Sequence, residues 1–410
     1  MKRSFADILQ DLDGERAHKL ARKLPEWAAA GAEIPSALSL EQCSSSATAR
    51  YKASLASRSG QQPPETSSSV GPHRCASLAV PPLNVPRVAV FQEAVPADVP
   101  QETVRAERIL DLTGGLGVDS WAVSQVAEQV VYYERDAALC AAAERNFARL
   151  GAGNITVRNE TVTPETQLPE ADLIYADPAR RSAAGRKVFL LEDCTPDILT
   201  LLPMLLEKAP ALMLKLSPMA DLSMLRERLG PALREIHVVE SDGEVKELLC
   251  LLSRAPSPEE PEIVVTRLPE ATFRFRMTEE REAEAVFAAG VQPGELLLEP
   301  CPALLKAGAF NLPCARLGLR KLAPSTHLYL APAPDSPFFK AWRVREVLPF
   351  GAAAFKTVRQ RWPRAEVTAR NLPLGSAELQ KKLGVAPGGD THIFACRLAD
   401  GSAALIITER

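Results

Sequence analysis

The chain has 410 residues, of which 46% are hydrophobic and 24% are charged, and its formal net charge is −3. This length exceeds one ordinary hydrophobic core, so we expect two to four domains of a soluble globular protein. No uninterrupted apolar run reaches transmembrane length, and residues 1–15 turn acidic where a signal peptide needs an apolar stretch. We therefore expect a cytoplasmic protein without a membrane partner.

The N-terminal region, residues 1–82, is predicted to be helical and to end in a flexible linker. Apolar residues at helical spacing predict a helix over residues 2–30, and a second helix begins near Ser39 with SLEQCSSSATARYKASLA. Residues 57–82 are rich in Ser, Pro, Gly and Gln, which is typical of a linker or a long surface loop. The second helix is expected either to cover a cofactor or simply to pack on the core. In the first case its polar contacts are Ser44, Ser45, Thr48, Tyr51 and Lys52.

Strands and helices alternate from about residue 100 onward. The expected strands are residues 108–112, 129–133, 155–157, 173–176 and 211–216, and the expected helices are residues 118–128, 136–150, 197–207 and 222–229. Two further strands, 235–239 and 245–252, flank Asp242-Gly243, which is a hairpin signal. Repeating βα units predict an α/β fold with a doubly wound, mostly parallel sheet, and the hairpin adds an antiparallel strand to it.

Two breaks in the pattern predict the domain boundaries. Residues 255–262, APSPEEPE, are Pro-rich and acidic, and short strands such as residues 272–276 follow them. A second break lies near residues 331–337, APAPDSP. We therefore expect four domains, over residues 1–82, 83–256, 257–325 and 326–410, of which the last two are small α+β domains.

The charges are distributed unevenly along the chain. Residues 306–410 contain 16 Lys and Arg against 7 Asp and Glu, whereas the remainder contains 32 basic and 44 acidic residues. Such asymmetry is typical of nucleic-acid contact. A basic surface that only keeps the domain soluble fits the charge alone equally well.

Cysteine and histidine usage gives no sign of a disulfide framework or a metal site. The eight cysteines are widely scattered without a CxxC pair, and the five histidines lack metal-ligand spacing. We expect most of these cysteines to be small buried hydrophobes in a reducing compartment.

The motif ILDLTGGLGVDS, residues 109–120, joins the first strand to the first helix. Its glycines allow a sharp turn and leave room for a ligand at the start of the helix. Glu134 ends the second strand about twenty residues on, where a carboxylate can accept hydrogen bonds from both ribose hydroxyls. The spacing departs from the dinucleotide pattern GxGxxG, and it places Asp111 and Asp119 near the turn. Carboxylates suit the sulfonium and amino groups of S-adenosylmethionine, so a methyl donor is favoured over a dinucleotide.

Several segments together resemble a known protein family. They are EQCSSSATARYKA, DLTGGLGVDS, DPARR, LKLSPMADL, LEPCPALLKAGAF, LAPSTHLYLA and ARNLPLGSAELQKKLGV, and they extend over most of the chain except residues 57–105. Residues 107–253 resemble a class I S-adenosylmethionine-dependent methyltransferase with a Rossmann-like sheet. The whole chain resembles a bacterial family that adds a ferredoxin-like domain, expected at 257–325, and a THUMP-like domain, expected at 326–410.

The resemblance implies a set of cofactor-binding residues. They are Asp111, Thr113, Gly114, Gly115, Gly117, Asp119, Glu134, Asn159, Glu160 and Asp177. Thr113 stands where the family motif usually has its first glycine, which makes the turn bulkier. Either Asn159 or Glu160 takes the position at the adenine edge.

The segment DPARR, residues 177–181, follows the fourth strand. Many enzymes that methylate amino groups of bases have Asp or Asn, two prolines and an aromatic residue there, so the resemblance implies that Asp177 and Pro178 accept N–H groups of the acceptor. Arg180 replaces the aromatic ring and can stack on a base, and Arg181 can pair with a phosphate. Alternatively, Asp177 caps a turn and the arginines form surface salt bridges. Lys215, which ends the fifth strand, is a weaker candidate.

The sequence therefore predicts an S-adenosylmethionine-dependent methyltransferase (EC 2.1.1.-) that acts on a base nitrogen of structured RNA, either rRNA or tRNA. THUMP-type domains elsewhere bind RNA, so the resemblance and the basic C-terminal region both favour an RNA substrate. One alternative is a methyltransferase for a protein or a small molecule. The other is a non-catalytic RNA-binding protein that retains the cofactor pocket as a relic.

Overall fold

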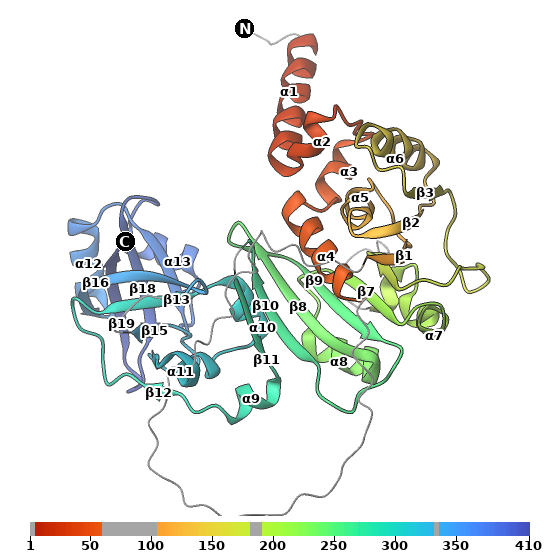
Figure 1. Cartoon of the computed structure of the whole chain (residues 1–410). Helices are drawn as coiled ribbons and strands as arrows, with labels where there is room; N and C mark the ends of the chain where they lie inside the picture. The colour runs from red at the N-terminus through yellow and green to blue at the C-terminus, as the bar shows by residue number, and fades with distance from the viewer. Residues whose placement is uncertain (1–4, 60–104, 181–190, 270, 332–335) are drawn as a thin grey trace, which may run out of the picture. The chain divides into compact units, whose positions relative to one another are not determined.

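The computed structural model describes residues 5–59, 105–180, 191–269, 271–331 and 336–410 (Figure 1). Most of the linker expected at residues 57–82 lies outside these ranges. Two compact units make up the chain: unit 1 contains Met1–Arg234 and Leu249–Ser257, and unit 2 contains Glu235–Leu248 and Pro258–Arg410.

The helix expected over residues 2–30 is interrupted near its end. It forms α1 (Phe5–Lys23) and α2 (Pro25–Ala29), with Leu24 between them in a non-helical conformation. The interruption has a local cause, because proline has no backbone N–H and restricts the residue before it, whereas it is well suited to the first turn of a new helix. Trp27 of α2 is fully buried and packs edge-on against Trp121, with ring centroids 6.3 Å apart.

The second N-terminal helix was also expected as one piece, and this expectation was wrong. It forms α3 (Ala37–Gln42) and α4 (Ser46–Ser59), separated at residues 43–45. The Lys23 ammonium donates to the Leu40 and Glu41 carbonyls at 2.7 and 2.8 Å, which satisfies the end of α3. The Ser45 and Thr48 side chains each accept from the other residue's backbone N–H, at 3.3 and 3.1 Å, and this exchange starts α4.

Unit 1 contains the parallel sheet that the βα pattern predicts. Its strands are β1 (Ala106–Asp111), β2 (Ala127–Tyr133), β3 (Ile155–Arg158), β4 (Leu173–Ala176) and β7 (Ala211–Leu216), in the order β7-β4-β1-β2-β3 with every neighbouring pair parallel. The carboxyl ends of parallel strands meet at one edge, where Asp111 ends β1, Glu134 follows β2 and Asp177 follows β4.

The helices next to this sheet each begin at an aspartate cap except the first, which begins after Gly117 without a side-chain cap. They are α5 (Val118–Ser124), α6 (Ala137–Arg149), α7 (Ile198–Lys208) and α8 (Leu222–Leu229). Asp136, Asp197 and Asp221 each accept a hydrogen bond from a backbone N–H in the first turn of α6, α7 and α8, respectively. The helix expected over residues 118–128 is shorter, because Ala127 already belongs to β2.

The predicted hairpin consists of β8 (Leu233–Ser241) and β9 (Glu244–Ser253), and the division between the units runs through it. Asp242 and Gly243 have φ of 55° and 76°, as a tight two-residue hairpin turn requires. Beyond β8 come β10 (Glu262–Arg267), which pairs with it in parallel, and β11 (Ala271–Phe275), which is antiparallel to β10. The complete order of this nine-stranded sheet is β11-β10-β8-β9-β7-β4-β1-β2-β3.

A second sheet lies within unit 2 and has eight strands in the order β12-β14-β15-β13-β16-β19-β18-β17. These are β12 (Val286–Phe287), β13 (Leu296–Pro300), β14 (Arg320–Lys321), β15 (Tyr329–Ala331), β16 (Phe339–Pro349), β17 (Glu366–Arg370), β18 (Thr391–Arg397) and β19 (Ala403–Glu409). The helices of this part of the chain are α9 (Met277–Glu282), α10 (Pro302–Ala307), α11 (Leu312–Leu317), α12 (Ala352–Arg361) and α13 (Ser376–Leu383).

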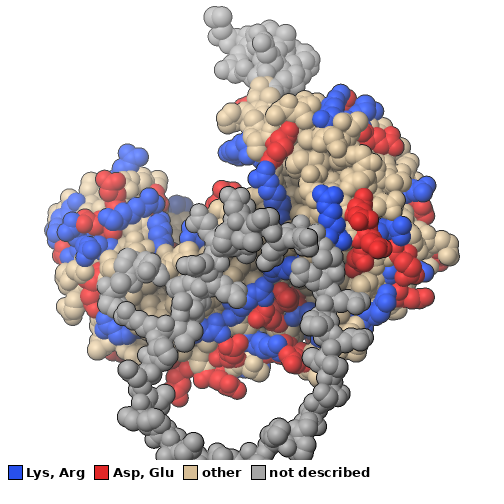
Figure 2. Space-filling view, viewed as in Figure 1, with Lys and Arg blue, Asp and Glu red and all other residues tan. Residues whose placement is uncertain are grey.

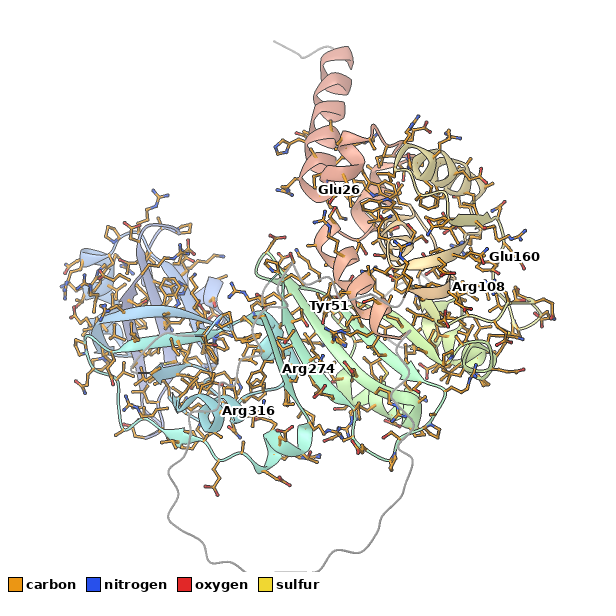
Figure 3. The ribbon with its side chains drawn as sticks, viewed as in Figure 1. Glu26, Tyr51, Arg108, Glu160, Arg274 and Arg316 are labelled. Atoms are coloured by element: carbon orange, nitrogen blue, oxygen red, sulfur yellow. The ribbon has the colours of Figure 1, made fainter. Side chains whose placement is uncertain are left out.

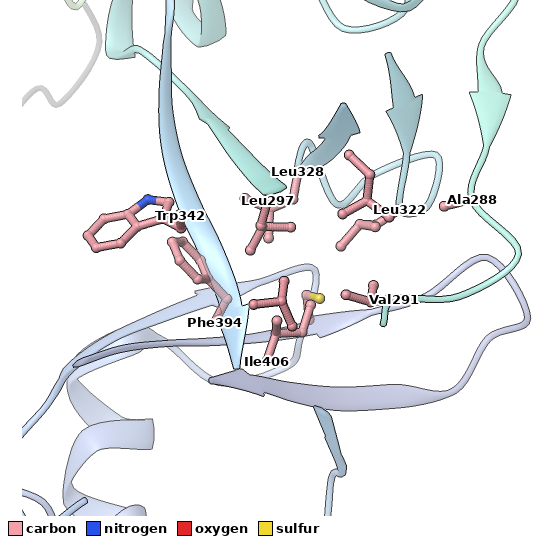
Figure 4. Close-up of a cluster of buried hydrophobic side chains, with 11 residues drawn as sticks. Ala288, Val291, Leu297, Leu322, Leu328, Trp342, Phe394 and Ile406 are labelled. Atoms are coloured by element: carbon pink, nitrogen blue, oxygen red, sulfur yellow. The ribbon is translucent and has the colours of Figure 1, made fainter. Parts of the chain in front are cut away.

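The second sheet has an apolar cluster on each side. One contains Leu297, Trp342, Phe394 and Ile406, and Figure 4 shows Trp342 and Phe394 at one end of it and Ala288 at the other. The other contains Val358 of α12, Leu379 and Leu383 of α13, and alternate residues of β17, β18 and β19. Because side chains alternate across a strand, the two clusters divide the residues of β18 between opposite faces.

The cysteines of the described chain are free thiols, and all but Cys43 are buried. Burial raises the pKa of Cys250, Cys301 and Cys396 to about 12 and that of Cys314 to about 11. They therefore stay protonated at neutral pH, as expected for small core residues.

Candidate active site

The glycine turn after β1 depends on the absence of side chains. A Cβ on Gly114 would lie 2.0 Å from the Tyr132 ring, and one on Gly117 would lie 2.6 Å from the Phe147 ring. Gly115 and Gly117 have φ of +54° and +89°, which residues with a Cβ rarely adopt. A Cβ on Gly115 would meet only a carbonyl oxygen, at 3.9 Å, so the turn is open on that side.

Asp111 stabilises the turn through two hydrogen bonds. Its carboxylate accepts the Thr113 backbone N–H at 3.0 Å and the Ser120 hydroxyl. Burial raises the pKa of Asp111 to about 7, although both hydrogen bonds favour its charged form. Asp111 thus joins β1, the turn and the start of α5.

Glu134 connects the turn to the end of β2. One carboxylate oxygen accepts the Gly115 N–H at 2.9 Å, and the other accepts the Asp136 N–H at 2.8 Å. Each oxygen can accept a further hydrogen bond, because an ionised carboxylate has about four lone-pair positions. The predicted ribose acceptor therefore lies beside the open side of the turn.

The two candidates for the adenine edge are placed differently. The Asn159 amide donates to the Glu134 and Arg135 carbonyls at 2.9 and 3.0 Å, so its nitrogen braces the end of β2. The Glu160 backbone N–H donates to the Glu134 carbonyl at 3.1 Å, and its side chain is exposed beyond β3 (Figure 3).

Asp119 lies in a buried polar network between α4 and the sheet. It accepts the Ser44 and Tyr175 hydroxyls, each at 2.8 Å, and its other oxygen lies 3.2 Å from the fully buried Lys52 ammonium. Lys52 also donates to Ser44 at 3.0 Å. Burial alone would raise the pKa of Asp119, but Lys52, Lys215 and the two hydroxyls outweigh burial and lower it. The carboxylate is thus held ionised.

Asp177 is tied directly to the glycine turn. Its backbone N–H donates to the Thr113 hydroxyl at 2.6 Å, and its half-exposed carboxylate forms an ion pair with Lys215 at the end of β7. The threonine that replaces the family's usual glycine therefore has a role here, because its hydroxyl links the turn to the end of β4. Pro178 is buried.

Comparison with known proteins identifies the family to which the chain belongs. A ferredoxin-like domain model matches residues 297–338, and a THUMP domain-like model matches residues 339–410. The crystal structure of a candidate methyltransferase from Porphyromonas gingivalis W83 is 31% identical, covers 97% of this chain and 88% of its own, and has a TM-score of 0.74. The chain belongs to the same methyltransferase family. It is the bacterial class I S-adenosylmethionine-dependent family with ferredoxin-like and THUMP-like domains that the sequence segments predict.

Two more distant structures cover smaller parts of the chain. An rRNA methylase from Streptococcus thermophilus is 11% identical and covers 36% of this chain and 86% of its own, with a TM-score of 0.28. A candidate methyltransferase from Streptococcus mutans, solved with SAH, is 13% identical and covers 36% and 89%, with a TM-score of 0.27. Neither likeness bears on the activity of this chain. No protein with a curated description matches it.

The cofactor of this methyltransferase family is S-adenosylmethionine, and the residues of the site fit it. The turn is open at Gly115, and the Glu134 carboxylate lies next to that opening. The buried Asp119 Oδ1 accepts no hydrogen bond within the described part of the chain, although the Lys52 ammonium lies nearby. An acceptor therefore remains near the start of α5.

The two arginines of DPARR are less fully described. β5 (Ala179–Arg180) pairs antiparallel with the short β6 (Cys194–Thr195), so the segment leaves the sheet edge in a small separate ladder. The Arg180 side chain and the whole of Arg181 lie outside the described residues. Their contacts with a base or a phosphate stay predictions.

Sequence reasoning missed some of the donors to Asp111 and Asp119. Tyr175 and Ser120 were not singled out, although both donate to predicted site carboxylates. A tyrosine in the otherwise aliphatic strand LIYA was the available signal, because a buried phenol needs a partner. Within the described residues there is no group of three or more potential metal ligands, and no helix long and apolar enough to cross a membrane.

Proposed function

We propose that this chain transfers a methyl group from S-adenosylmethionine to a base nitrogen of structured RNA, either rRNA or tRNA, in the cytoplasm. Three features support the proposal: the glycine turn with its carboxylates, the acid at the end of β4, and the basic THUMP-like region. Each contributes a different part of the function.

The glycine turn is suited to hold the cofactor. S-adenosylmethionine supplies an electrophilic methyl group on its sulfonium when bound. Glu134 accepts hydroxyls of its ribose, and the open backbone at Gly115 allows close approach. Thr113, Gly114, Gly117 and Asp111 keep the turn in shape, and Asp119 provides negative charge near the start of α5.

The observation that carries the proposal is the link between Asp177 and the cofactor turn. The Asp177 N–H donates to Thr113, so a half-exposed carboxylate is fixed at the edge of the sheet beside the turn. In that position Asp177 accepts an N–H of the acceptor base, and Lys215 holds the carboxylate in place. Positioning of this kind is sufficient for methyl transfer, because the main requirement is in-line approach of the nitrogen lone pair.

The basic C-terminal region is suited to hold the RNA. Residues 306–410 contain 16 basic and 7 acidic residues, and the THUMP-like match covers most of them. Figure 2 shows Lys and Arg side chains on the part of unit 2 that carries α12 and α13, with some acidic residues between them. A surplus of positive charge attracts the phosphate backbone independently of sequence.

Mass spectrometry of modified nucleosides tests the proposal. We expect one methylated nucleoside in rRNA or tRNA from cells that contain the protein, and its loss from cells without it. Purified protein with radiolabelled S-adenosylmethionine should restore it in the unmodified RNA, but the Asp177→Ala variant should not. Label transferred only to protein or to small molecules would reject RNA as the substrate. Cofactor binding without any transfer would support the relic alternative.

A further inference from the structure

Three family segments of unit 2 have no part in the proposed cofactor and acceptor sites, yet they converge. Glu299 belongs to LEPCPALLKAGAF, His327 to LAPSTHLYLA and Arg370 to ARNLPLGSAELQKKLGV. An Arg370 guanidinium N–H donates to Glu299 at 3.3 Å, and Arg370 is close enough to His327 to lower its pKa. His327 stacks on Phe310 with ring centroids 3.9 Å apart. Segments about 30 to 70 residues apart thus meet at one place.

The strand register places further charged residues on the same face of the second sheet. Lys340 of β16 lies opposite Glu299 of β13, and Glu366 of β17 lies opposite His392 of β18. Arg370 is four residues beyond Glu366, so it shares a face with it. The opposite face carries residues such as Ile393, which packs in the cluster with α12 and α13.

Two cations on this face lie against the Trp342 ring, and Arg370 is linked to the same place through Glu299, which also accepts the Trp342 indole N–H at 3.4 Å. The Lys340 ammonium lies 4.0 Å from the Trp342 ring centroid, and the Arg410 guanidinium lies 5.7 Å from it. The His392 ring lies 4.5 Å from the Trp342 ring. We refer to Lys340, Arg370 and Arg410 as the cation cluster.

The cations of the cluster act on one another and on His392. Burial lowers the pKa of His392 to about 4, and all three members of the cluster contribute. Burial also lowers the pKa of Lys340, and Arg410 is the next cause. His392 is therefore neutral at physiological pH, and it adds no charge to the cluster.

The acidic residues nearby, Glu299 and Glu366, offset the cluster only in part, because the pKa of Lys340 stays lowered although both of them act to raise it. Glu299 pairs with Arg370, but among the described residues no carboxylate lies within 4.0 Å of the Lys340 or Arg410 side-chain nitrogens. Arg370 Nε is buried and has no hydrogen-bond partner in the described chain. Unpaired donors and mutually repelling cations are unfavourable until an anion binds to them.

We propose that the cation cluster of the THUMP-like sheet binds phosphodiester groups of the RNA substrate. The inference rests on the proposed function, and it assigns part of the RNA contact to three named residues. A guanidinium matches two phosphate oxygens in its plane, and a lysine contributes a point charge. Trp342 is only 3% exposed and lies beneath Lys340, so the cluster offers no open ring for base stacking. The contact is therefore with the backbone and independent of base sequence.

The test is binding of the full chain to fluorescein-labelled total tRNA and rRNA fragments across a salt series. In the triple variant K340Q/R370Q/R410Q, affinity should fall at least tenfold at about 100 mM salt, and the slope of log K against log salt should decrease by about 2 to 3. The control variant R228Q/K246Q/R281Q removes the same charge from exposed residues outside the basic region 306–410 and should change affinity less than threefold.

The outcomes separate this inference from the proposed function. If the wild type binds RNA and the cluster variant binds equally tightly, or the control variant loses as much affinity, the cluster is not the site. If the wild type binds S-adenosylmethionine but no RNA, the RNA substrate itself is rejected. Should the triple variant fail to fold, K340Q/R410Q keeps the Arg370–Glu299 pair and must still weaken binding and reduce the slope by about 1 to 2.

Discussion

The charged side chains around the cofactor turn of unit 1 have close partners, whereas most of those in the cation cluster of unit 2 do not. Around the turn, Asp119 is matched by Lys52, Asp177 by Lys215, and Glu134 by two backbone N–H groups. In the cluster, three cations share a face on which only Arg370 has an ion-pair partner among the described residues. A site that orients a small molecule needs fixed partners, whereas a surface for a polyanion keeps its positive charge available.

The largest effect should come from Asp177→Ala, which removes the carboxylate but keeps the backbone N–H bonded to Thr113. We expect the single-turnover rate of methyl transfer to fall at least about a thousandfold, because the acceptor is no longer positioned. Affinity for the cofactor should change little. Asp172→Ala is the control, since Asp172 precedes β4 at its other end and accepts the backbone N–H of Arg108 at 3.0 Å; Figure 3 labels Arg108. A rate for Asp177→Ala near that of the wild type would make DPARR a structural turn.

Lys52→Met should be the most destabilising change among the ion pairs. It leaves the buried Asp119 carboxylate without its ammonium partner, which typically costs about 3–5 kcal/mol. Denaturant unfolding measures the loss, and the double variant K52M/D119N should recover much of it. Lys208→Met is a matched control, because its pair with the exposed Glu170 should contribute less than about 1 kcal/mol. Equal losses in both variants would contradict a special role for the Lys52 pair.

Glu134→Ala should weaken S-adenosylmethionine binding at least tenfold. The loss of an acceptor for two hydroxyls, together with the Gly115 N–H, costs on the order of 1.5–3 kcal/mol. Calorimetry measures the change, and Glu128→Ala, at the exposed start of β2, serves as the control. Unchanged affinity, or tighter binding of NAD than of S-adenosylmethionine, would contradict the proposed ribose contact.

Asp111 should make stability depend on pH. Burial raises its pKa from 3.8 to about 7, so between these values the native state holds a proton that the unfolded state has lost. The free energy of unfolding should therefore decrease by roughly 2 kcal/mol from pH 5 to pH 7 through this group. Urea unfolding of Asp111→Asn should lack this component. If the free energy of unfolding of the variant and of the wild type changed equally with pH, Asp111 would not be the cause of the pH dependence.

The sequence predicted which residues lie at the carboxyl edge of the sheet better than it predicted the contacts that these residues make. Parallel βα units place Asp111, Glu134 and Asp177 at one edge by topology alone, so their proximity followed from the pattern. The break in the second N-terminal helix did not, because it depends on Lys23, about 20 residues earlier in the chain. The Lys52–Asp119 pair joins residues 67 positions apart, and no local propensity encodes such a contact.

In the C-terminal region, too, the composition could be predicted to matter but the contacts between distant residues could not. Its excess of basic residues was visible in the sequence, but the members of the cation cluster come from separate strands and the chain end. Only the strand register brings them together. The domain boundaries and the cofactor, base and phosphate contacts of the site residues stay predictions.

The buried thiols make unfolding of the chain measurable in each unit. A protonated, buried sulfur does not react with alkylating reagents, so labelling reports the moment at which its surroundings open. Cys140 and Cys194 lie in unit 1, and Cys301, Cys314 and Cys396 lie in unit 2. Pulse alkylation followed by peptide mass spectrometry would therefore time the opening of the two units separately in the native sequence, without an added probe.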